Sequence, residues 1–201
     1  MRVAVVAIVL LLLAACGPRM VESDVTRFSA LPSGPSPGSV TIIPLPDQRG
    51  SLEFQAYAEM VAEELRLAGY QPTPATARPA ADYEARLTWG VGDAVTEFRS
   101  SPGTVFGGTS IFGNRTGYGM GIGVPLGNTG YVDSTTRYTK WVRLVLRPFG
   151  NPDAANVFEG SAVTREGGTT IDPVMPYLVE ALFTNFPGGS GTTERVRIPQ
   201  R

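Results

Sequence analysis

The sequence predicts an α+β domain in which a mostly antiparallel sheet of about six strands packs two helices on one face. Two segments repeat apolar residues at helical spacing, and several others alternate apolar with polar residues or are β-branched, as strands are. An apolar N-terminal run divides the chain further. It predicts a signal peptide over 1–15, an N-terminal region over 16–38 and a single domain over 39–201.

The N-terminal run has the length of a signal peptide. Arg2 precedes 11 apolar residues, Val3 to Leu13. A membrane-spanning helix needs about 20 such residues. The tetrapeptide Leu13-Ala14-Ala15-Cys16 resembles the lipobox of bacterial lipoproteins. That resemblance implies cleavage before Cys16, a diacylglyceryl group on its thiol and an acyl chain on its amine. The alternative is a plain signal peptide in which Cys16 is only a small apolar residue.

The resemblance also implies a location. Two or more acyl chains give stable anchoring, because each buried CH₂ contributes ~0.8 kcal/mol and one chain alone binds a membrane only marginally. Gly17 rather than aspartate follows the cysteine, which resembles proteins sorted to the outer membrane. We therefore expect a lipid anchor at the periplasmic face of the outer membrane.

Composition excludes several classes of function. Removal of Arg2 leaves 16 basic and 18 acidic residues, a net charge of −2 that argues against a nucleic-acid partner. The chain has no histidine, so it lacks the commonest general base and the usual zinc ligand. With Cys16 lipidated, no disulfide within the chain is possible. We expect no cofactor and no metal site.

The first elements lie around a proline-rich spacer. Residues 17–24 are expected to be a tether, 25–28 a short strand and 32–38 a stiff spacer. Residues 40–43 are β-branched throughout and predict a buried strand that ends before Pro44.

A first helix is predicted between the N-cap Ser51 and the stop at Gly69. Its apolar face consists of Phe54, Tyr57, Ala58, Val61, Leu65 and Ala68.

After a linker over 72–79, residues 83–91 alternate strictly, which predicts a strand with one wet face. The residues expected to point inward are Tyr83, Ala85, Leu87, Trp89 and Val91. Residues 95–98 extend this strand or turn back from it. A strand over 138–147 then forms an antiparallel hairpin with 156–164 through a turn at 148–153.

The second helix is expected to start at the N-cap Asp172, with Pro173 at its first position, and to end at 187–189. It is apolar nearly all round, which predicts deeper burial than for the first helix. A last strand over 193–198 points Val196 and Ile198 inward.

A glycine-rich insertion at about 101–130 breaks this pattern. Within it, large apolar residues alternate with glycine or proline: Tyr118, Met120, Ile122, Val124 and Leu126. Three interpretations stay open, namely a loop between two strands, a hairpin that covers part of the sheet, and a contact for a partner, a second copy or the membrane.

No catalytic motif is complete. The 188–192 stretch lacks the final glycine of G-x-S-x-G, and no histidine could activate Ser190, so we expect a turn there. The sole lysine, Lys140, follows a threonine, which excludes a P-loop.

Asp82 and Glu84 lie on one strand face at a spacing that paired catalytic acids use, but Arg86 continues that face, which is typical of solvated surface. The oxygens of Asn151, Asp153 and Asn156 fit a hairpin turn better than a calcium site.

The chain as a whole resembles bacterial envelope lipoproteins of the domain-of-unknown-function 4136 type. The resemblance rests on the lipobox, the helix entry at 51–54 and its exit at 67–70, the alternating strand at 82–89, the glycine- and tyrosine-rich middle, and 186–188. It implies an α+β envelope domain without established activity. We expect a non-enzymatic lipoprotein that binds an envelope protein or itself. The alternative is a transport-accessory or lipid-carrying lipoprotein with an apolar groove.

Overall fold

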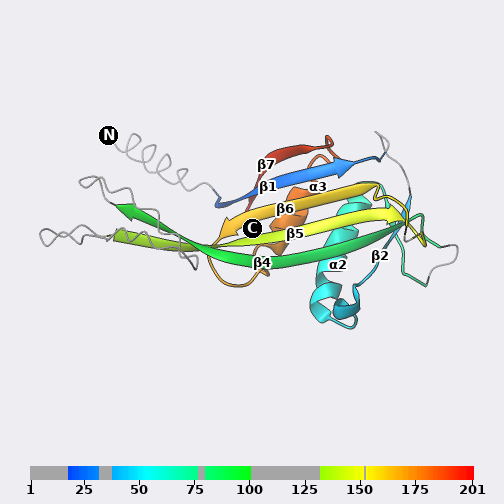
Figure 1. Ribbon diagram of the computed structural model, residues 1–201, viewed down its shortest axis with the longest axis horizontal. Helices are drawn as coiled ribbons and strands as arrows, with labels where there is room; N and C mark the ends of the chain where they lie inside the picture. Colours follow the sequence, from blue (N-terminus) through cyan, green and yellow to red (C-terminus); the bar gives the residue numbers. More distant parts are fainter. Residues whose placement is uncertain (1–17, 32–37, 77–79, 101–131, 152) are drawn as a thin grey trace, which may run out of the picture.

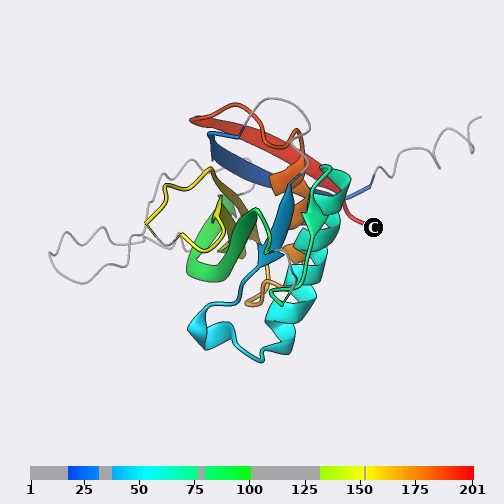
Figure 2. The ribbon, with the colours of Figure 1, turned by 90° about the vertical axis from the view of Figure 1, so that its right-hand side faces the viewer.

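A computed structural model describes residues 18–31, 38–76, 80–100, 132–151 and 153–201. They form one curled, seven-stranded mixed sheet with two helices on one face (Figures 1 and 2). The elements in chain order are β1 (Met20–Ser29), β2 (Ser39–Ile42), the 3-10 helix η1 (Pro46–Gln48), α2 (Leu52–Leu67), β3 (Gln71–Pro72), β4 (Tyr83–Ser100), β5 (Val132–Pro148), β6 (Phe158–Glu166), α3 (Met175–Phe183) and β7 (Thr192–Pro199).

The strand order is β3-β2-β4-β5-β6-β1-β7. Four neighbouring pairs are antiparallel, and β2 runs parallel to both β3 and β4. Parallel neighbours need a crossover, which α2 supplies between β2 and β3. The predicted α+β class with two helices on a largely antiparallel sheet is confirmed. The seventh strand is the two-residue β3, at the start of the expected linker.

The first strand corrects the prediction most. Residues 20–24 were expected to belong to a tether, but β1 starts at Met20 and spans ten residues. It pairs along most of its length with β6 on one side and β7 on the other. Val21 and Val25 are fully buried, and Val25 belongs to the core that α3 covers, so the segment before the proline-rich spacer is an inner strand of the sheet.

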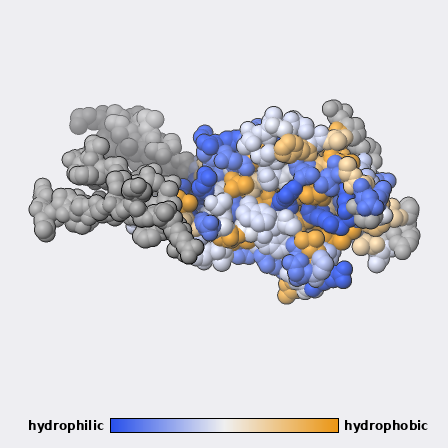
Figure 3. Space-filling model, in the orientation of Figure 1, coloured by the Kyte–Doolittle hydropathy of each residue, from blue (hydrophilic) through white to orange (hydrophobic). Residues whose placement is uncertain are grey.

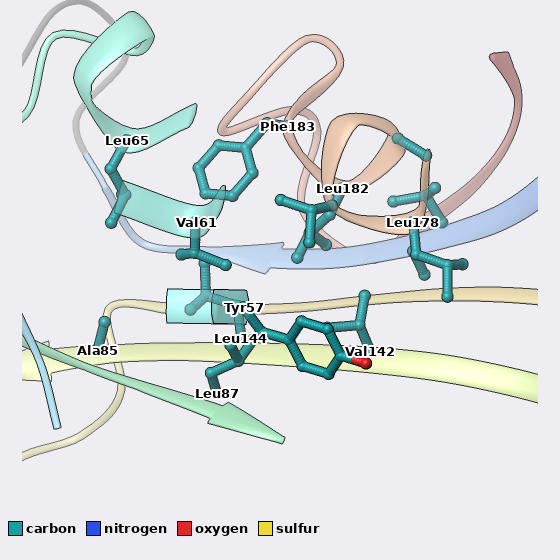
Figure 4. Close-up of a cluster of buried hydrophobic side chains, with 14 of the residues drawn as sticks. Tyr57, Val61, Leu65, Ala85, Leu87, Val142, Leu144, Leu178, Leu182 and Phe183 are labelled. Atoms are coloured by element: carbon teal, nitrogen blue, oxygen red, sulfur yellow. The ribbon is translucent and has the colours of Figure 1, made fainter. Parts of the chain in front are cut away.

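The hydrophobic core lies between the sheet and the two helices (Figure 4). Tyr57, Val61 and Leu65 of α2 and Leu178 and Leu182 of α3 meet apolar side chains from the strands, among them Ala85, Leu87, Val142 and Leu144. Each fully buried aliphatic side chain contributes roughly 1.5–3 kcal/mol. The apolar face predicted for the first helix is confirmed at its four buried positions, Phe54, Tyr57, Val61 and Leu65.

The starts of the two helices differ from each other. Ser51 caps α2 as predicted, because its hydroxyl accepts a hydrogen bond from the Phe54 amide at 3.2 Å. The predicted cap at Asp172 is wrong. The N-cap of α3 is Val174, and the Asp172 carboxylate instead accepts a hydrogen bond from the Tyr57 hydroxyl at 2.8 Å. Asp172 therefore ties α2 to the entry of α3.

The end of α3 is held by Arg27, an inward side chain of β1 that is only 3% exposed. Its guanidinium donates hydrogen bonds to the carbonyl oxygens of Ala181, Leu182 and Thr184 at 3.0, 3.1 and 2.6 Å. The end of a helix leaves its last carbonyls short of partners, and of these three the Ala181 carbonyl also accepts from the Thr184 amide at 3.3 Å. The helix stops at Phe183, before the predicted 187–189, and Asn185 follows with φ +58°.

The hairpin of β4 and β5 is longer than predicted and reaches beyond the core (Figure 1). A bulge between Val91 and Ala94 separates the part over the helices from a ribbon in which β4 pairs with β5 up to Ser100 and Val132. Val91 was expected to point into the core, but it is 39% exposed. The core ends at Trp89, whose ring packs on Phe54 and Tyr57.

Candidate functional site

The sheet face opposite the helices is the candidate site. Alternation along the strands turns one set of side chains to the helices and the next set away from them. We call the outward set the open face; Figure 3 shows this face, on which hydrophilic and isolated hydrophobic side chains are interspersed. Its members are Glu22, Asp24, Thr26, Phe28, Glu84, Arg86, Thr88, Trp141, Arg143, Val145, Arg147, Glu159, Ser161, Val163, Arg165, Arg195 and Arg197.

Two aromatic side chains interrupt the charges on the open face. Trp141 lies flat over Gly90 of the neighbouring strand, where an added Cβ would sit 2.8 Å from the indole ring. The glycine thus makes room for a large ring on the sheet surface. Phe28 of β1 is 56% exposed near the opposite end of the strand from Met20. Trp141 is half-buried. Aromatic rings among arginines are typical of protein-binding surfaces.

Glu84 is the centre of a three-residue cluster. Its carboxylate is nearly buried and forms ion pairs with Arg147 and with Arg86, the latter at 3.4 Å. The prediction that Glu84 is an ordinary solvated residue is therefore wrong. The cause is Arg147, which lies on the adjacent strand β5 directly opposite Glu84 in the register.

A second cluster contains Glu159. Arg143 forms an ion pair with its carboxylate, and the Asn156 side-chain amide donates to it at 2.8 Å. These two donors, Asn156 first, hold the pKa of Glu159 below its usual range. The carboxylate stays ionised at neutral pH, which suits recognition better than proton transfer.

A third cluster joins β1 to the edge strand β7. Arg195 pairs with Asp24 at 3.0 Å and Glu22 at 3.3 Å, and Arg197 pairs with Glu22 at 2.7 Å. The carboxylate of Asp24 raises the pKa of Arg195 further. All three clusters place arginines at the surface, where they can also contact a ligand.

The open face is hollowed where the first half of β1 lies between β6 and β7. This β1 hollow has a volume of about 360 Å³. It is lined by Met20, Glu22, Asp24, Arg137, Val163, Thr164, Arg165, Glu166 and Arg195. The lining is mostly polar, and it does not offer the apolar groove that a lipid carrier needs.

Polar groups are also buried on the helix side of the sheet. Lys140 follows the inward parity of Val142 and Leu144, is 1% exposed and donates to the Gly167 carbonyl at 2.8 Å. Burial lowers the pKa of its ammonium group, opposed by the charges of Glu166 and Asp172. Burial and the hydrogen bond to Asp172 raise the pKa of the Tyr57 phenol. Both groups fasten the α3 entry to the core.

The remaining predicted positions have structural roles. The Asp82 carboxylate accepts hydrogen bonds from the Ser39 amide and hydroxyl at 2.8 and 2.7 Å, which lower its pKa. Asp82 and Glu84 are thus held by different partners. The Ser190 hydroxyl accepts from the Ser29 amide at 3.1 Å, which confirms a turn at 188–192.

The asparagine-rich turn is confirmed as well. The Asn151 side-chain oxygen accepts from the Asp153 amide at 3.2 Å, within the connection between β5 and β6. In the part of the chain that the structure describes, no three His, Cys, Asp or Glu side chains gather closely enough to hold a metal ion. Cys16 and the predicted contact residues Tyr118, Met120, Ile122, Val124 and Leu126 lie outside the described residues.

Comparison with known proteins assigns no family. No family model matches the sequence, and no curated protein matches it. A PelC dodecamer from Paraburkholderia phytofirmans and a point variant of it match with TM-scores of 0.37 and 0.38 and 13% identity, and each match covers 78% of this chain and 91% of the PelC chain. A PDZ domain protein from Parabacteroides distasonis matches with a TM-score of 0.48 at 8% identity, and the match covers 90% of this chain and 40% of the PDZ domain protein.

None of the helices in the described ranges is long and apolar enough to cross a membrane.

Proposed function

We propose that this chain is a lipid-anchored lipoprotein of the bacterial envelope whose α+β domain binds another envelope component without catalysing a reaction. In this proposal, Cys16 carries the lipid and holds the domain at the periplasmic face of the outer membrane. The open face is the surface that meets the partner.

The observation that carries the proposal is the difference between the two faces of the sheet. One face is buried under α2 and α3, while the other exposes Phe28 and a ladder of arginines and carries the half-buried ring of Trp141. Stability alone does not require aromatic side chains on the solvent side of a sheet, where polar residues suffice. Arginines beside exposed aromatic rings are the residue types enriched in protein interfaces.

The ion-pair clusters favour recognition over catalysis. Each carboxylate of the open face is held by at least one arginine, so its negative charge is balanced inside the domain. General acid–base catalysis needs a group that gives up and regains a proton near neutral pH. Paired carboxylates of this kind are poor candidates for that step.

The polar β1 hollow argues against the alternative of a lipid carrier that encloses acyl chains. A cavity for acyl chains needs apolar walls, and this hollow has three arginines and three carboxylates in its lining.

Site-specific photocrosslinking in cells tests which face binds. A photoreactive amino acid replaces Thr88 or Ser161 on the open face, and Gln55 or Glu59 on the exposed side of α2 serves as the matched control. We expect discrete adducts of one mass from the open-face positions and none above background from α2. Adducts only from the α2 positions would contradict the proposal.

A further inference from the structure

The chain is tied to its proposed anchor by a very short link. Only three residues separate Cys16 from Met20, where β1 begins. A fully extended chain covers at most ~3.6 Å per residue, so the start of β1 lies within about 15 Å of the lipidated residue. This inference rests on the lipid anchor of the proposed function.

The short link determines which part of the domain faces the membrane. Met20 lines the β1 hollow and is 42% exposed, and the hollow lies beside the end of β1 that the link reaches. The opposite end of the strand, at Ser29, is nine residues away, or roughly 30 Å at the rise of a β-strand. The hollow is therefore held next to the lipid headgroups.

This end of the open face carries excess positive charge. Around the hollow, the five arginines Arg19, Arg137, Arg165, Arg195 and Arg197 face the three carboxylates Glu22, Asp24 and Glu166. Arg19, Arg195 and Arg197 form ion pairs with those carboxylates. Among the carboxylates whose side chains the structure describes, none forms an ion pair with Arg137 or Arg165. These two guanidinium groups supply the excess of two positive charges.

We propose that the β1 hollow docks on anionic phospholipid headgroups of the membrane that holds the anchor, with Arg137 and Arg165 binding the headgroup phosphate. A guanidinium binds phosphate through two parallel hydrogen bonds and is weakly hydrated, which suits it to a partly dried surface. A volume of about 360 Å³ accommodates a headgroup but not a whole lipid. The exposed Met20 side chain at the rim adds apolar contact with the interface.

The helix layer supports the same orientation by its opposite charge. The described residues of α2 and α3 include Glu53, Glu59, Glu63, Glu64 and Glu180 but only one basic residue, Arg66. An anionic membrane repels this layer and attracts the end that holds Arg137 and Arg165. The remainder of the open face, with Trp141, is then left accessible to the partner.

Fluorescence quenching in vesicles tests the docking. The lipidated chain is reconstituted with one added cysteine as a dye site, either Gln200→Cys beside the hollow or Ala155→Cys at the other end of the body. The vesicles contain a headgroup-nitroxide lipid in phosphatidylcholine, with or without phosphatidylglycerol. We expect the dye at position 200 to be quenched more than the dye at 155, and more so with phosphatidylglycerol.

Two double variants identify the groups responsible. Replacing Arg137 and Arg165 by glutamine should lower the ratio of docked to undocked protein by about fivefold per arginine. Replacing Arg49 and Arg66 by glutamine removes the same charge from the helix side and should leave quenching unchanged. Thermal unfolding of both variants checks that they fold.

Vesicle flotation separates this inference from the anchor itself. If the chain floats with vesicles but quenching at 200 ignores both phosphatidylglycerol and the Arg137/Arg165 substitution, the docking is overturned and the anchor stands. Loss of flotation of the unsubstituted chain would instead overturn the proposed function. Protection of the position 200 dye from iodide in detergent, without vesicles, would assign the hollow to a second copy and also overturn the docking.

Discussion

At the residue scale, Arg27 shows how one buried cation joins two layers. Its guanidinium satisfies three carbonyl oxygens at the end of α3, and its remaining contact is Glu194 at 3.3 Å. A positive charge at this position also complements the negative end of the helix dipole. The alternation of Val21, Ser23, Val25 and Arg27 places all four on the same inward face, so the sequence pattern does contain the signal for its burial.

Replacement of Arg27 by methionine keeps the stem of the side chain but removes every donor. We expect a loss of about 2–4 kcal/mol in the free energy of unfolding, because the carbonyls of Leu182 and Thr184 lose a charged donor and that of Ala181 keeps only the Thr184 amide. Urea denaturation measures this loss. Arg27→Lys should lose less, and Arg197→Met, at an exposed arginine of the open face, should change stability by no more than about 0.5 kcal/mol. Equal losses at 27 and 197 would contradict this role.

At the scale of elements, the link between α2 and α3 depends on the Tyr57–Asp172 hydrogen bond. The Tyr57 hydroxyl lowers the pKa of the Asp172 carboxyl. A carboxyl with a lowered folded-state pKa stabilises the fold above its unfolded pKa of about 3.9. That stabilisation is lost as the pH falls through the folded-state pKa.

The Tyr57→Phe variant should therefore lose about 1 kcal/mol at neutral pH, because a hydrogen bond to a largely exposed carboxylate is partly screened. As the pH falls through the lowered folded-state pKa of Asp172, the variant and the parent chain should converge. Denaturation curves over a pH series measure both effects. A difference in stability that stays constant from pH 7 to pH 2 would show that Asp172 is not the group involved.

The same scale shows what could be predicted from sequence. Helix α2, its cap and the β5–β6 hairpin follow from periodicity and turn residues close in the chain. Residues 20–24 of β1 and the two-residue β3 could not be predicted as strands, because they are strands only through pairing with segments far away in sequence. Glu84 is buried for the same reason, since its partner Arg147 comes 63 residues later.

The candidate site was less accessible to sequence reasoning. Because side chains alternate along β5, Trp141 points to the face opposite that of Val142, which places its ring on the open face. The ring also needs Gly90 of the neighbouring strand beneath it, and the local sequence does not indicate this. The β1 hollow combines residues from β1, β5, β6 and β7, and no local pattern brings these together. The alternation along β5 places Lys140 on the inward face. It does not indicate which group accepts the hydrogen bond of its ammonium, the Gly167 carbonyl.

At the scale of the whole molecule, charge divides the domain into two layers. The helix layer is acidic, and burial together with the nearby Glu180 raises the pKa of Glu64 there. The open face is rich in arginine, with the exposed ring of Phe28 and the half-buried ring of Trp141 between its ion pairs. A short link from Cys16 to β1 would fix how the acidic helix layer and the arginine-rich open face are oriented relative to a membrane. The anchor would then orient the domain as well as hold it at the membrane.

The anchor itself is the central claim, and membrane fractionation after a high-salt wash tests it most directly. Salt removes proteins held by charge alone, including any contribution of Arg137 and Arg165. We predict that the parent chain stays in the membrane pellet and that the Cys16→Ser variant leaves it. A Cys16→Ser variant that remains in the washed membrane as fully as the parent chain would contradict the account.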